Sequence, residues 1–333
     1  MEYVSNKDKE KYRKLCKEKK TIPLFIQDWY MDATCENGEV WDVILVERNG
    51  VVVGAFPYRY INRRGMYYIE KGGIAGYRGG IWFEFENRVS NARRETFIAD
   101  VIREIVSSLP SYDCFKIPFD LGFDDWHQFY CLGFQQTTRY SYVINSEHEC
   151  IAEEQLFSGL QKKRRYILRQ AMKNFSVNEE INIDEYWTLF EKGNAERNRN
   201  ALYSKEAFFR ITNAALRHNA CKMVKAINKQ GQVVASQIVM MDDSTVYKIF
   251  TTFVGQEGSD ANVLLDWYCI TSAVSEGKAY DFAGGMDINI AHYNASFNAK
   301  KMPYFEIEKH SKKYKLYALL RDIKNRRLFQ DSI

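Results

Sequence analysis

The sequence predicts an α/β fold (α+β, with mixed sheets) built from two tandem copies of one unit. Three short patterns carry this prediction: a four-residue turn signal ending in Gly, a Tyr-Asp pair beside an apolar strand, and a Tyr-x-x-x-Phe pattern that precedes another strand. They lie at residues 47–50, 112–113 and 130–134, and again at residues 228–231, 280–281 and 293–297. Self-similarity in a fixed order indicates a repeated architecture. Strands alternate with helices in both copies, and the hairpins make the sheets mixed.

In the first half, Asn49-Gly50 separates apolar runs at 41–46 and 51–60, which is a strong hairpin signal. Apolar residues at helical spacing predict a helix over 91–109. A strand at 113–118, a short helix at 124–132 and a strand at 139–144 then complete the first unit.

The second half opens with a predicted bridging helix over 153–173, which is basic outside its apolar positions. The expected helices that follow lie at 183–193, 205–218, 262–276 and 289–296, and the expected strands at 222–228, 233–241, 245–254, 280–283 and 303–308. Residues 255–260 are expected to form a loop, and 312–328 a basic C-terminal helix. We therefore predict two domains: 1–150, and 151–333 with the bridging and C-terminal helices.

The composition limits the class of protein. The 333 residues carry a formal net charge of +4, which is compatible with an anionic ligand such as a coenzyme, a nucleotide sugar or RNA. Seven cysteines without C-x-x-C spacing suggest a reducing compartment. No apolar run follows the start and no stretch is long enough to span a membrane, so we expect a cytoplasmic protein.

The order of elements resembles the GNAT N-acetyltransferase superfamily, and two such units joined by a basic helix resemble the FemABX family of tandem-GNAT acyltransferases. The resemblance covers roughly residues 20–325 and implies a bacterial protein active on a cell-envelope or similar precursor. Three segments carry it: Arg-Arg-Tyr-Ile-Leu-Arg-Gln-Ala at 164–171, Asp-Phe-Ala-Gly-Gly-Met at 281–286 and Tyr-Asn-Ala-Ser-Phe-Asn-Ala-Lys at 293–300.

The choice of acyl donor depends on departures from the family patterns. Family members that use aminoacyl-tRNA resemble one another in a Phe-Lys pair, which reads Tyr293-Asn294 here. The missing lysine disfavours tRNA and favours acyl-CoA, with acetyl-CoA expected, as the cosubstrate. By resemblance to the phosphate-binding loop of GNAT enzymes, the cofactor-binding residues are Gln256, Gly258, Ser259, Ala261 and Asn262, although Glu257 and Asp260 would repel phosphate. No His or Cys pair has metal-ligand spacing, so we expect no metal.

Acyl transfer to an amine needs a base for the amine proton and an acid for the leaving group. By resemblance, Tyr293 is the candidate acid; the alternative is a core aromatic. Asp281 is the candidate base because it ends a predicted central strand, where ligands bind in open α/β sheets; the alternative is a turn residue. Tyr130, the copy of Tyr293, is expected to be kept for packing.

Candidate substrate-binding residues are more dispersed. Tyr77 and Arg78 lie in a loop rich in Gly and aromatic residues, where Arg78 could clasp a phosphate or carboxylate. Gly284 and Gly285 permit positive φ and a close backbone approach, for a ligand or for a tight turn. The resemblance adds residues of the basic helix and of the region after it, namely Arg164, Arg165, Arg169, Arg199 and Tyr203.

Three functions remain open: an acyl-CoA-dependent N-acyltransferase acting on a sugar, peptide or cell-envelope precursor; an aminoacyl-tRNA-dependent transferase of the FemABX type; and a non-catalytic binding protein. We expect a small-molecule or glycan-precursor acceptor and no DNA, and the oligomeric state stays open. The C-terminal helix, apolar at 316, 319, 320, 323 and 328, could lie on an anionic membrane, but we expect it to pack on the sheet.

Overall fold

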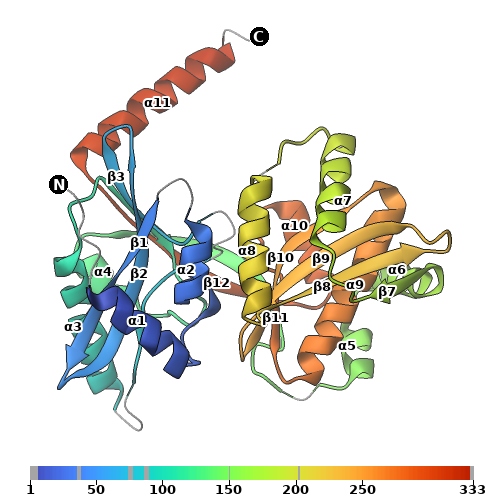
Figure 1. Cartoon of the computed structure of the whole chain (residues 1–333), viewed down its shortest axis with the longest axis horizontal. Helices are drawn as coiled ribbons and strands as arrows, with labels where there is room; N and C mark the ends of the chain where they lie inside the picture. The colour runs from blue at the N-terminus through green and yellow to red at the C-terminus, as the bar shows by residue number, and fades with distance from the viewer. Residues whose placement is uncertain are drawn as a thin grey trace. The chain divides into compact units, whose positions relative to one another are not determined.

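The computed structural model describes residues 7–35, 39–73, 78–85, 90–149, 151–201 and 203–330, which form two compact units (Figure 1). Unit 1 contains the described residues up to Thr138 and those from Tyr304 onward, and unit 2 is Arg139–Pro303. We expected a boundary near residue 150, which separates the two sequence repeats. The compact units do not coincide with the repeats, because most of the final strand of each repeat lies in the unit built mainly from the other repeat.

Unit 1 is a mixed sheet with helices around it. Its elements are α1 (Lys7–Glu18), η1 (Leu24–Ile26), α2 (Asp28–Thr34), β1 (Val40–Arg48), β2 (Val51–Arg63), β3 (Met66–Glu70), β4 (Trp82–Phe83), α3 (Asn91–Ser108), β5 (Cys114–Pro118), α4 (His127–Cys131), the end of β12 (Lys300–His310) and α11 (Lys312–Gln330). Asn49 and Gly50 both have positive φ, as the predicted β1–β2 hairpin requires. The strand order is β1-β2-β3-β5-β12, in which β3 and β5 are parallel and the other neighbours antiparallel.

Unit 2 repeats this plan with one parallel pair. Its elements are the end of β6 (Gln135–Ile144), α5 (Glu153–Gly159), α6 (Lys162–Asn174), β7 (Phe175–Asn178), α7 (Ile183–Glu196), α8 (Lys205–Arg217), β8 (Cys221–Asn228), β9 (Val233–Met241), β10 (Thr245–Phe253), α9 (Gly255–Ser275), β11 (Ala279–Asp281), α10 (Ile288–Ala295) and the start of β12. The strand order is β6-β11-β10-β9-β8-β7, in which β10 and β11 are parallel.

The core of unit 2 lies on both faces of its sheet. Residues of β9 alternate: the side chain of Gln237 contacts α9, and its neighbour Ile238 points to the opposite face. On that opposite face, Phe250 of β10 packs edge-on against Phe208 of α8, with ring centroids 5.0 Å apart. The face that carries α9 holds the larger cluster of buried apolar residues, which includes Leu265 and Ile270.

Three expectations about elements were wrong. The strand at 139–144 does not close the first unit, because Val143 and Ile144 pair with β11 of unit 2. The bridging helix is two helices, α5 and α6, because Leu160 and Gln161 are extended. The break is held by Arg165, whose guanidinium donates to the Leu160 carbonyl oxygen at 2.7 Å, and by the Gln161 N–H, which donates to the Ser296 carbonyl oxygen at 3.0 Å.

The third wrong expectation is the loop at 255–260, since α9 begins at Gly255. Gly258 is inside the first turns of this helix and is buried. A Cβ at Gly258 would lie 2.4 Å from the Val234 carbonyl oxygen. The glycine therefore allows α9 to approach β9 closely rather than opening a loop.

Candidate active site in unit 2

The two parallel strands of unit 2 separate part-way along the sheet. β10 and β11 pair only from Thr245–Ala279 to Tyr247–Asp281, and β10 then continues alongside β9 to Phe253. The helix between them, α9, packs over this point. The carboxyl ends of parallel strands are where open α/β sheets place ligands.

A β-bulge in β10 changes the face of the sheet on which side chains lie, and it directs Lys248 toward α9. The register of β10 against β9 shifts between Lys248 and Phe250. Because the bulge adds one residue, Lys248 faces α9 whereas Phe250, two residues later, faces α8. Thr251 faces α9 again, and its hydroxyl donates to Asn262 Oδ1 at 2.9 Å.

Asp266 of α9 is the centre of a buried polar cluster. Its side chain has no exposed surface, and Lys248 Nζ lies 2.8 Å from its carboxylate. Four further side chains donate to that carboxylate: Tyr293 Oη at 2.5 Å, Gln237 Nε2 at 2.9 Å, Tyr280 Oη at 3.2 Å and Asn262 Nδ2 at 3.4 Å. Burial of a carboxylate is costly unless a cation and hydrogen-bond donors of this kind surround it.

Tyr293, on α10, links the cluster to the surface. Its ring is partly exposed, but its hydroxyl lies inside the cluster, where it also accepts a 3.0 Å hydrogen bond from Asn262 Nδ2. Burial and the Asp266 carboxylate raise the pKa of Tyr293 well above its ordinary value, and the Arg164 guanidinium opposes this shift. That guanidinium lies over the Tyr293 ring, 4.3 Å from the ring centroid, and Lys248 Nζ lies 5.3 Å from the same centroid. Tyr293 therefore holds its proton at neutral pH, beside two cations.

One acceptor in the cluster lacks a donor. Gln237 is fully buried, and its Nε2 donates to both Asn262 and Asp266, which fixes the orientation of the amide. Among the described residues, no group donates to Gln237 Oε1. A buried acceptor of this kind calls for a water molecule or a ligand N–H.

The first turn of α9 already binds a carboxylate. The Gly255 N–H donates to Glu196 Oε2 at 2.9 Å, and Glu257 adds a second acid to this turn. The Gly258 N–H is used within the helix, where it donates to the Val254 carbonyl oxygen. Helix N-termini attract anions, but in this conformation the anion is a side chain of the protein itself, so the turn fits a diphosphate poorly.

The residues predicted to bind the donor fall into two groups. Gln256 is exposed and donates to Asp260 at 3.1 Å, and Ser259 is half-buried. Gly258 and Ala261 are buried against the sheet, whereas Asn262 is part of the Asp266 cluster. Their roles as cofactor-binding residues stay predictions.

Asp281, the predicted base, lies at the end of β11 and is fully buried. It accepts hydrogen bonds from the Ser141 hydroxyl and from the Ala283 N–H, the latter at 2.8 Å. These bonds hold the turn after β11, in which Ala283 has a φ of 53°. Asp266 is thus the carboxylate that contacts Tyr293.

Positive φ is absent at both Gly284 and Gly285. A Cβ on Gly285 would lie 2.8 Å from the Tyr142 ring, so the backbone at Gly285 closely approaches the Tyr142 side chain. The Gly284 carbonyl oxygen accepts from Asn294 Nδ2 at 2.9 Å. Asn294, which stands at the position of the lysine expected in aminoacyl-tRNA-dependent members of the resembling family, therefore orders the loop after β11.

The basic residues of α6 divide by what they contact. Arg164 lies at Tyr293, and its Nε donates to Ser296 Oγ at 2.7 Å. Arg165 is tied to carbonyl oxygens at the end of α5, and Arg169 lies over Phe157, 5.1 Å from its ring centroid. The structure thus brings only Arg164, of these three arginines, to the cluster.

The basic and aromatic residues after α7 that were predicted to bind substrate contact other parts of unit 2. Arg199 is exposed, and its N–H donates to the Asn194 carbonyl oxygen at 3.0 Å. Tyr203 packs between Phe190 and Phe250, each with its ring centroid 5.1 Å away. Substrate contacts by Arg199 and Tyr203 stay predictions.

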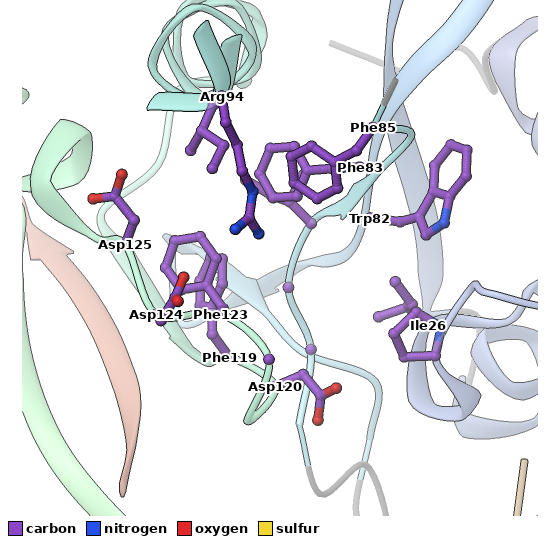
Figure 2. Close-up of a pocket in the computed structure, with 16 residues that line it drawn as sticks. Ile26, Trp82, Phe83, Phe85, Arg94, Phe119, Asp120, Phe123, Asp124 and Asp125 are labelled. Carbon is purple, nitrogen blue, oxygen red and sulfur yellow. The ribbon is translucent and has the colours of Figure 1, made fainter. Parts of the chain in front are cut away.

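Unit 1 holds a separate cavity of about 180 Å³, shown in Figure 2. Phe83 and Phe85 line one side and Phe119 and Phe123 another, and the Arg94 side chain points between them. Asp120, Asp124 and Asp125 lie at its rim. An apolar cavity with a few charged groups is suited to a small ligand.

Arg78, one of the two loop residues predicted to bind the acceptor, lies near this cavity. Arg78 is 1% exposed; its Nη1 lies 3.2 Å from Asp120 Oδ1, and its guanidinium stacks 4.8 Å from the Tyr304 ring centroid. Arg78 thus engages a carboxylate of its own chain. Tyr77 lies outside the described residues. Tyr130 is 64% exposed, so the expectation that it packs a core was wrong; its neighbour Phe129 does so instead.

Sequence reasoning missed Lys248, Asp266, Gln237 and Tyr280. One signal was present: Asn262 and Asp266, four residues apart, interrupt an otherwise apolar run at 261–270 within a helix. The role of Lys248 depends on the bulge, which has no signature in the sequence.

Comparison with known proteins agrees with this fold. Residues 160–293 match a family model described as an acetyltransferase (GNAT) domain. FemX superposes with a TM-score of 0.69 at 13% identity, covering 93% of this chain and 98% of that chain. The L-PGS of Bacillus licheniformis gives 0.55 at 9%, covering 96% and 98%, and a tandem GNAT protein from the clavulanic acid biosynthesis pathway gives 0.50 at 11%, covering 92% and 97%.

No curated protein matches the sequence significantly. At these identities the solved structures establish the fold, and the family model locates an acetyltransferase domain within it. The matched segment contains Lys248, Asp266 and Tyr293. The chain therefore has the tandem GNAT acyltransferase fold and resembles the FemABX family.

Proposed function

We propose that the protein is an N-acyltransferase whose chemistry takes place at the Lys248–Asp266–Tyr293 cluster of unit 2. The observation that carries this proposal is the hydroxyl of Tyr293, which is held protonated beside two cations at the point where β10 and β11 separate. A protonated phenol suits a general acid, and the Arg164 guanidinium partly offsets the effect of burial and of the Asp266 carboxylate on the tyrosinate left behind.

In the proposed step, the amine nitrogen attacks the donor carbonyl carbon and the bond from that carbon to the leaving atom breaks. The leaving group, a thiolate from a thioester donor or an alkoxide from an ester donor, takes the Tyr293 proton. The proton lost by the amine returns to Tyr293 through solvent, so the protein ends unchanged. Gln237 Oε1, a buried acceptor without a donor among the described residues, fits an amine N–H or the water that carries this proton.

The first candidate donor is an acyl-CoA, with acetyl-CoA as the simplest probe, and the acceptor is an amine of a sugar, peptide or cell-envelope precursor. The second candidate is an aminoacyl-tRNA ester. The carboxylate of Glu196 on the first turn of α9 favours this second donor, because it occupies the place where a diphosphate would bind.

The transfer chemistry is tested by Tyr293→Phe, with product formation measured by mass spectrometry over a panel of amines and both donor classes. Loss of a general acid should lower kcat about 100-fold to 10,000-fold. Tyr130→Phe is the matched control, because Tyr130 occupies the same repeat position but is 64% exposed in unit 1. Equal activity of the Tyr293→Phe variant and the native protein would rule out the acid role.

The donor is tested by Glu196→Ala and calorimetric titration with acetyl-CoA and longer acyl-CoAs. Removal of the competing carboxylate should tighten acyl-CoA binding about fivefold or more. No acyl-CoA binding to either protein, with transfer from aminoacyl-tRNA, would select the second donor. Binding without transfer from any donor would leave a non-catalytic tandem-GNAT protein.

A further inference from the structure

Three leucines form an exposed strip on α11. Leu316, Leu319 and Leu320 are 59%, 57% and 58% exposed, and their spacing of three and four residues places them on one face of the helix. We had expected this face to pack on the sheet, and it does not. An exposed apolar strip of this kind marks a surface for another partner.

The first two turns of α11 are attached to unit 1. Tyr314 stacks on His310 with ring centroids 4.7 Å apart and meets the Tyr68 ring edge-on at 5.9 Å. Lys313 Nζ donates to the Gly65 carbonyl oxygen at 2.6 Å, and Tyr317 is half-buried. These contacts fix the first turns of the helix with the leucines directed away from unit 1, and Figure 1 shows the rest of α11 extending beyond the sheet.

The helix is also strongly basic. Residues 312–330 include seven Lys or Arg and one Asp, a formal net charge of +6, whereas the whole chain carries only +4. Lys312 and Lys315 are exposed, and each lies four residues before a leucine of the strip. Apolar and basic side chains therefore share one outward surface.

We infer that the leucine strip of α11 docks onto an anionic lipid surface. The leucines would enter the boundary between headgroups and acyl chains, and the flanking lysines would contact the lipid phosphates. A second copy of the chain explains the surface less well, because pairing two such helices would bring two sets of six net positive charges together. No described helix is long and apolar enough to cross a bilayer.

The test is co-sedimentation of the full chain with vesicles of phosphatidylcholine alone and of an equimolar mixture with phosphatidylglycerol. We expect binding to the mixed vesicles that weakens as salt is raised, and little binding to the neutral ones. Each basic residue near an anionic surface contributes roughly fivefold to the binding constant. Lys312→Gln with Lys315→Gln should therefore weaken binding about 25-fold.

Replacement of Leu316, Leu319 and Leu320 by Gln should abolish binding to the mixed vesicles. The matched control is Val51→Gln, which removes an apolar side chain that is 58% exposed on β2, outside α11. Unchanged circular dichroism would show that the variants fold. Equal binding by the leucine variant and the control would overturn the inference. So would a native dimer, detected by light scattering, that the leucine variant loses.

Discussion

Replacing Lys248 by Met leaves the Asp266 carboxylate buried without its cation. Removal of one partner of a buried ion pair costs about 3–5 kcal/mol. Asp266 keeps Tyr293, Gln237 and Tyr280 as donors, so we expect a cost near the lower limit, about 3 kcal/mol. Met is close to Lys in length and apolar, which limits any contribution from a cavity.

A second substitution separates the unpaired charge from the change in packing. Adding Asp266→Asn to Lys248→Met removes the charge and should recover about 1–2 kcal/mol.

The assay is urea-dependent hydrogen exchange of peptides from α9, which reports the free energy of opening unit 2 without requiring the whole chain to unfold in one step. Comparison of the single and double variants separates the contribution of the unpaired charge from that of packing. A deficit below about 1 kcal/mol in Lys248→Met, or no recovery in the double variant, would show that Lys248 and Asp266 are not a buried pair.

Two further predictions concern stability. Gly258→Ala should destabilise unit 2 by about 2–3 kcal/mol, because its Cβ would lie 2.4 Å from the Val234 carbonyl oxygen. Gly284→Ala is the control: nothing lies within 4 Å of its Cβ, so it should change the free energy of unfolding by less than about 0.5 kcal/mol. Urea unfolding compares the two variants, and equal effects would contradict the packing argument. Burial would raise the pKa of Asp113, but hydrogen bonds led by that from the Tyr67 N–H outweigh it and lower this pKa. The stability that Asp113 contributes is then present above about pH 4 and lost as pH falls through the lower folded value, so Asp113→Asn should flatten the acid limb of a stability–pH curve.

The elements that the sequence predicted correctly are those fixed by local chemistry. Asn49-Gly50 supplies the positive φ at two consecutive residues that a tight hairpin needs, and this requirement is visible in the sequence. The break between α5 and α6 has no such signature, because Leu160 continues the apolar helical spacing. It is made by tertiary hydrogen bonds of Arg165 and Gln161.

The candidate site was only partly predictable for the same reason. Tyr293 could be found because its pattern recurs in the chain and resembles a known family. Lys248 could not, because its direction is set by a bulge in a strand that reads as continuous. The glycine at 258 was misinterpreted: a Gly near a strand end suggests a loop, but here it lets a helix lie against a carbonyl group.

The two repeats also supply an internal comparison that bears on why the polar cluster exists. In each unit, one helix connects the two parallel strands: α3 between β3 and β5, and α9 between β10 and β11. The buried residues of α3 are Ile98, Val101, Ile102 and Ile105, all apolar. The fold is thus built in unit 1 without buried charge at this helix, and buried ion pairs are seldom more stable than apolar packing. The Asp266 cluster of unit 2 is therefore not a requirement of the fold, and chemistry at Tyr293 is the reason we propose for its presence.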